Sequence, residues 1–96
     1  MELSIFARFH ARKGLEAAVD EALREQVPRV WDEPGCLEIG AYRSSRDPRL
    51  FWIASHWANE AAFEVHAELP NTKRFVKRMQ ELIDHPFEAA RASRIG

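Results

Sequence analysis

Two side chains near the middle of the chain have the clearest capacity for chemistry. Trp57 ends the apolar run LFWIASHW, and His66 follows it by nine residues. An imidazole exchanges protons near neutral pH, so His66 is a candidate general base or proton shuttle. The indole of Trp57 offers one hydrogen-bond donor and a large stacking surface. We therefore take His66 and Trp57 as the candidate catalytic residues.

The remaining candidates are side chains that can bind a small ligand. Tyr42 and Asn71 carry polar groups that can form hydrogen bonds, and Arg8 carries a positive charge for an anion. Phe6 and Phe51 are aromatic residues that can pack against a ring. We expect these five residues to bind the substrate.

Each candidate also has a purely structural explanation. Trp57 can be a bulky strand end that packs on the next helix, and His66 lies on the apolar stripe of that helix. Asn71 can cap a helix. Tyr42 can fill a barrel interior, and Arg8 can be a charge at the rim of a sheet. The distinction depends on whether the indole and the imidazole turn toward a cavity or toward the core.

Alternating and helical patterns predict the elements that must position these residues. We expect strands over 2–10, 36–43, 50–57 and 87–95, and helices over 15–32 and 60–69. Pro28 should kink or end the first helix near residue 27. Asn59 should cap the second helix, and Asn71 or Thr72 should cap its continuation after Pro70. The order β-α-β-β-α-β predicts one α+β domain over 1–96, a ferredoxin-like antiparallel sheet with helices on one face.

The third strand, 50–57, is apolar on both faces, which a sheet covered on one face does not require. Leu50, Trp52 and Ala54 alternate with Phe51 and Ile53. A strand that is apolar on both faces is buried on both faces, and no helix remains to cover the second one. We therefore expect a homodimer that stacks two sheets and leaves an apolar space for a flat ligand.

Composition excludes several classes of protein and of site. The chain has 96 residues and a net charge of −1, so bulk charge does not favour nucleic acid or anionic lipid. Its single cysteine, Cys36, forms no internal disulfide, and no His/Cys spacing predicts a metal site. We expect no signal peptide, no membrane span and a cytoplasmic location.

On the first helix, four-residue spacing predicts the ion pairs Asp20–Arg24 and Glu25–Arg29.

Several segments together resemble a known family. These are DEPGCLEIGAYRS at 32–44, the strand ending in Trp57, the following ANEAAFEVH, and Pro70 four residues after His66. In this order they resemble the small antibiotic biosynthesis monooxygenase domains, including the quinol monooxygenases, of the dimeric α+β barrel superfamily. The likeness covers almost the whole chain. Ser55 stands where family members often have an acidic residue, and Asn71 where many have a histidine.

The resemblance implies a reaction and a partner. Relatives of this kind oxidise a quinol or an anthrone with O₂ and use no flavin, haem or metal. The substrate supplies the electrons once it is deprotonated, and the protein supplies a dry pocket, a base and donors for the oxyanion. It also implies a homodimer. For this chain, His66 is the candidate base or proton shuttle of such a reaction.

Three other functions remain open. A non-catalytic dimeric domain of the same fold would bind a small ligand or regulate. An isomerase or dehydratase would use the same dry pocket and histidine without oxygen. An RNA-recognition domain shares the element order and uses strand aromatics, but RLFWIASHW lacks the Gly-Phe signature of that class, so we expect no nucleic-acid partner.

Overall fold

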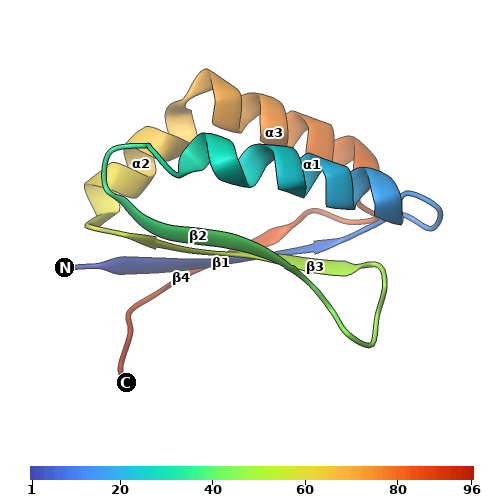
Figure 1. The fold of residues 1–96 in the computed structure, drawn as a ribbon, viewed down its shortest axis with the longest axis horizontal. Coiled ribbons are helices and arrows are strands. Elements are labelled where there is room, and N and C mark those ends of the chain that lie inside the picture. Colours follow the sequence, from blue (N-terminus) through green and yellow to red (C-terminus); the bar gives the residue numbers. More distant parts are fainter.

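The computed structural model describes residues 1–96 and contains one four-stranded sheet with three helices on one side (Figure 1). The elements in chain order are β1 (Leu3–His10), α1 (Glu16–Val30), β2 (Cys36–Arg43), β3 (Leu50–Trp57), α2 (Glu60–Glu68), α3 (Pro70–Leu82) and β4 (Glu88–Ala92). The strands lie in the order β2-β3-β1-β4, and every neighbouring pair is antiparallel. The predicted ferredoxin-like α+β fold is confirmed.

The first helix continues past Pro28 and ends at Val30, two residues before the predicted end. Proline in a helix removes one backbone hydrogen bond. The last turn nevertheless holds, because Val27 and Val30 on either side of the proline are buried at 8% and 1% exposure. The chain then turns at Gly35, whose φ of +83° lies in the left-handed region that glycine occupies at little cost.

The break between α2 and α3 follows from Pro70. Leu69 has φ −64° and ψ 141°, because a residue before proline is disfavoured in the helical region. Asn59 caps α2 as predicted, and its side chain accepts from the Ala62 backbone N–H at 2.8 Å. The prediction that Asn71 or Thr72 caps the continuation is wrong. Leu69 is the N-cap residue of α3, with no side-chain cap, and Pro70 is its first residue, a position where the missing N–H costs nothing.

The core lies between the sheet and the helices. The odd-numbered residues of β1 and β3 point into it, and Phe9, Phe51 and Trp57 are at most 2% exposed. At the start of β2 a bulge leaves Leu37 without a partner, so that Cys36 pairs with Trp57 while Glu38 pairs with His56. Because of this extra residue, Cys36 packs on the helix side against the cluster that contains Trp57.

The other face of the sheet carries no helix (Figure 1). Phe6 and Tyr42 are 46% and 56% exposed there, and Trp52 pairs with Tyr42 on the neighbouring strand. His56 lies on the same face and shares a 2.8 Å hydrogen bond with Ser4. We call this surface the open face. The doubly apolar character of residues 50–57 therefore has a structural cause, since β3 is the strand that supplies both the core and the open face.

Candidate functional site

A cavity of about 240 Å³ lies between the sheet and the helices. Twelve of its sixteen lining residues are hydrophobic, so the interior is suited to an apolar ligand. The four polar side chains in its wall are Gln26, Ser55, His66 and Thr72. The sequence predicts an apolar space between the stacked sheets of a dimer, which the structure of one chain does not test. Within the single chain, the apolar cavity lies on the opposite side of the sheet, under the helices.

His66 is held in the cavity wall by a carboxylate that sequence reasoning did not single out. The Nδ1 atom of His66 lies 2.6 Å from Oε1 of Glu33, and the two side chains are only 13% and 11% exposed. Thr72 Oγ1 lies 3.4 Å from the same nitrogen. A carboxylate at Nδ1 fixes the proton on that atom, which leaves the lone pair of the neutral ring on Nε2. Nε2 is therefore free to accept a proton.

The turn before β2 brings Glu33 to this histidine. A Cβ atom on Gly35 would lie 2.4 Å from the Cβ of Ala62 on α2, so only glycine allows the turn to approach the helix so closely. The backbone N–H of Ala58 donates to Gly35 O at 2.8 Å and ties the turn to the end of β3. Glu33, two residues earlier, thereby reaches the face of α2 that carries His66.

Trp57 lies behind His66, outside the set of cavity-lining residues. It is 0% exposed, and the centroid of its ring is 4.7 Å from that of His66. The indole N–H donates to Ser55 Oγ at 3.0 Å. Ser55 does line the cavity, and because its oxygen accepts from the indole, its own proton is available to a ligand. Trp57 is thus in contact with the candidate base, and its only polar group is already engaged.

The structure separates the other predicted site residues from His66. Phe6, Arg8 and Tyr42 point to the open face, as their pairing with Ala54 and Trp52 requires. These three side chains therefore do not meet His66 within one chain. They lie on the open face, and none of them lines the cavity.

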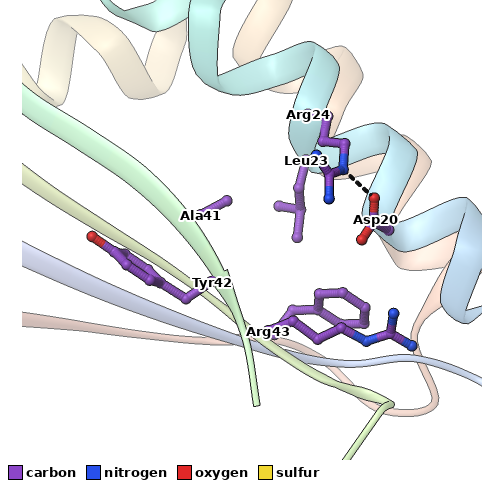
Figure 2. A pocket seen from close by; sticks show the side chains of 7 residues that line it. Asp20, Leu23, Arg24, Ala41, Tyr42 and Arg43 are labelled. Carbon is purple, nitrogen blue, oxygen red and sulfur yellow. Dashed lines mark hydrogen bonds and ion pairs between the residues drawn. The ribbon is translucent and has the colours of Figure 1, made fainter. Parts of the chain in front are cut away.

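Phe51 lies on the helix side but in a separate hollow. It is 2% exposed, and the Arg43 guanidinium carbon lies 5.2 Å from the centre of its ring. Together with Leu23 and Ala41 it lines a pocket of about 160 Å³ at the edge of the sheet (Figure 2). Figure 2 also shows the predicted ion pair between Asp20 and Arg24 at the rim of this pocket.

Asn71 lies in a groove between α1 and α3, and its side-chain oxygen is 3.5 Å from Arg29 Nη1. The predicted Glu25–Arg29 ion pair does not form. Glu25 instead binds Arg78 of α3 at 2.7 Å, because α3 packs beside α1 and offers a closer guanidinium. That contact lowers the pKa of Glu25.

One group of possible metal ligands exists that no sequence spacing suggested. Donor atoms of His10, Asp84 and His85 lie within 4.8 Å of one another at one end of the sheet. Asp84 already contacts His10 at 2.7 Å and Arg49 at 3.0 Å, and Asp47 contacts the second nitrogen of His10 at 3.1 Å. The hydrogen bond from His10 is the main cause that lowers the pKa of Asp84. These groups satisfy one another as an ion-pair cluster, and none of them lines the 240 Å³ cavity.

The fold and the cavity define the class of protein: a ferredoxin-like α+β domain with an apolar cavity under its helices. The model of the antibiotic biosynthesis monooxygenase family matches residues 3–78. The chain therefore belongs to this family. No protein of curated function matches it by sequence.

Solved structures share the fold over nearly the full chain. The Rv0793 protein of Mycobacterium tuberculosis superposes with a TM-score of 0.93 at 18% identity, covering 100% of this chain and 97% of its own. The PA3566 protein of Pseudomonas aeruginosa gives 0.90 at 25% identity, with 99% and 95% covered. A structure described as an antibiotic biosynthesis monooxygenase gives 0.90 at 20% identity, with 98% and 99% covered. At these identities the likeness establishes the fold.

Proposed function

We propose that this protein is a cofactor-independent monooxygenase that oxidises a small electron-rich aromatic, such as a quinol or an anthrone, with O₂. The observation that carries the proposal is a histidine in the wall of a largely apolar cavity, held by a glutamate through Nδ1 with Nε2 free. Membership of the antibiotic biosynthesis monooxygenase family supports the same reaction class.

His66 Nε2 would take the proton of a phenol or of an acidic ring methylene. The Glu33 carboxylate, 2.6 Å away, would stabilise the imidazolium that forms. The hydroxyls of Ser55 and Thr72 line the same cavity and would donate to the resulting oxyanion, and the apolar walls would keep water from quenching it. Trp57 is a positioning residue in this proposal, because it packs on the imidazole ring.

The electrons for oxygen come from the substrate anion. The anion transfers them to O₂, and a carbon–oxygen bond forms to give a peroxide. The O–O bond then breaks as the carbonyl forms, and the distal oxygen leaves as water with the proton returned from His66 and the second hydrogen of the oxidised carbon. One methylene and one O₂ become one carbonyl and one water, so no external reductant is required.

We further propose that the protein is a homodimer that buries the open face. Phe6 and Tyr42 are large side chains about half exposed on a surface without a helix, and monomeric proteins rarely expose such patches. Phe6, Arg8 and Tyr42 then belong to the interface between copies, and the cavity under the helices remains outside it.

No helix of the chain is both long enough and apolar enough to cross a membrane, and a cytoplasmic location stays a prediction.

The reaction is tested by oxygen uptake with a panel of naphthoquinols and anthrones. We expect uptake above the autoxidation background, its loss in His66→Ala, and its retention in Asp32→Asn. Asp32 is an exposed acidic residue in the same turn as Glu33, so Asp32→Asn shows the effect of a surface change near the site that leaves His66 and Glu33 intact. Turnover that persists under nitrogen would assign a proton-transfer reaction instead. Binding of these compounds with no uptake by any of them would favour the non-catalytic ligand-binding function.

A further inference from the structure

The groove between α1 and α3 is positively charged. It has a volume of about 280 Å³, and its wall contains Arg29, Arg74 and Arg78 against the single carboxylate of Glu25. Three guanidiniums and one carboxylate leave a local charge of +2, on a chain whose net charge is −1. Glu25 is already bound to Arg78. Arg29 and Arg74 are therefore the guanidiniums with no carboxylate partner.

The groove adjoins the apolar cavity. Gln26 and Phe75 line both hollows, so they form the partition between the charged groove and the space in front of His66. Both hollows lie on the helix side of the sheet, so stacking two copies through their open faces leaves the groove accessible. The cavity and the groove therefore share a wall, and Gln26 and Phe75 are the residues that a ligand occupying both hollows would contact.

Gln26 supplies a second observation, which is independent of the arginines. It is only 4% exposed, yet its amide makes no hydrogen bond within the chain. No fully enclosed polar atom of the chain lacks a partner, so this amide must remain open to the hollows that it lines. An amide that opens into a hollow and has no partner within the chain is suited to bind a polar group of a ligand.

The first turn of α3 adds to the same preference. The helix starts at Pro70 without a side-chain cap, and Asn71 in its first turn lies in the groove. Free N–H groups at a helix start favour negative charge. Arg29 reaches the same residue, since its Nη1 lies 3.5 Å from the Asn71 side-chain oxygen. The positive charge of the groove itself comes from side chains of both helices, Arg29 in the last turn of α1 and Arg74 on α3.

We propose that the ligand of this protein is an aromatic compound with an anionic substituent, a carboxylate or a sulfonate. Its rings occupy the cavity, its polar linkage meets Gln26, and its anionic group binds Arg29 and Arg74 in the groove. This inference rests on the proposed function, because it uses the same cavity, and it adds the charge that distinguishes the substrate from a neutral quinol.

Two dyes that differ by one sulfonate test the inference. N-phenyl-1-naphthylamine is neutral, and 8-anilinonaphthalene-1-sulfonate carries one negative charge; both fluoresce when they enter an apolar site. We expect the sulfonate to bind about tenfold more tightly, the size of one charge-assisted hydrogen bond. Arg29→Gln and Arg74→Gln should each reduce this advantage and leave the neutral dye unaffected. Added salt should reduce it as well.

The controls separate failure of this inference from failure of the proposed function. Arg24→Gln removes an exposed arginine of α1 that lies outside the groove and pairs with Asp20, so it should change neither dye. Ala67→Phe fills the cavity and should abolish both. If the neutral dye binds and the sulfonate gains nothing, the anion groove is refuted and the cavity stands. If neither dye depends on Ala67, the cavity itself is not the ligand site, and the proposed function fails with the inference.

Discussion

The contact between Glu33 and His66 makes a measurable contribution to stability, whatever reaction the protein catalyses. Glu33→Gln keeps the shape of the side chain and removes its charge. A hydrogen bond to a charged group contributes about 1.5–3 kcal/mol, against about 0.5–1.5 kcal/mol for a neutral one. With both side chains less than 15% exposed and 2.6 Å apart, solvent screens little of the difference. We therefore expect a loss of about 1–1.5 kcal/mol.

A loss of that size is well resolved by thermal unfolding. For a domain of about 100 residues, 1 kcal/mol shifts the Tm by about 4–8 °C, so Glu33→Gln should lower it by about 4–12 °C. Circular dichroism at one fixed protein concentration gives the measurement, since association would otherwise shift the Tm. Asp32→Asn, which removes a neighbouring exposed charge, should change the Tm by no more than a few degrees.

A double-mutant cycle assigns the effect to the histidine. On a His66→Leu background, Glu33→Gln should no longer cost stability, because the imidazole that the carboxylate binds is gone. Two results would refute the reasoning. One is a Glu33→Gln variant no less stable than Asp32→Asn. The other is an equal loss on both backgrounds, which would mean that Glu33 acts through other contacts.

Three further outcomes follow from single features of the fold. Gly35→Ala should lower the free energy of unfolding by at least about 2 kcal/mol, because it combines a positive φ with a 2.4 Å clash. Gly14→Ala, where φ is +88° and the space is open, should lower it by about 1 kcal/mol. Urea unfolding measures both values. Phe6→Lys on the open face should convert a species of about 22 kDa, twice the 11.1 kDa chain, into a monomer by sedimentation, whereas Val65→Lys, also exposed, should not. Burial and a nearby glutamate raise the pKa of Cys36, so its thiolate forms at higher pH than usual and iodoacetamide should alkylate it more slowly at pH 8 than a free cysteine peptide.

The element order was accessible from sequence because it depends on local pattern. Alternation defined β1, the asparagine at position 59 marked the start of α2, and Pro70 marked the break after it. The sequence did not indicate which face of β3 points into the core. Its two faces are both apolar, so alternation gave no preference between Trp57 and His56, and only the packing of the helices resolves which of them faces the core.

The partner of His66 was beyond sequence reasoning for a different reason. Glu33 lies 33 residues away in the chain, and the contact depends on how closely the turn at Gly35 approaches α2. The sequence showed only that Glu33 is an acidic residue next to a tight Pro-Gly turn, and the side chain of such a residue is more often solvated. Gln26 carried a clearer signal, as a polar residue one turn from Ala22 and one turn from Val30 on the buried side of α1.

The bulge at the start of β2 also has a consequence for contacts between the sheets of separate molecules. β2 is an edge strand, and an edge with free N–H and C=O groups can pair with the edge of another chain. The bulge at Leu37 interrupts the β2–β3 ladder at one end of β2. A bulge increases the local twist of the strand, and a twisted edge pairs less readily with the edge of another sheet. In the homodimer proposed above, two copies would instead meet through their open faces, and a two-fold arrangement of that kind would stop at two.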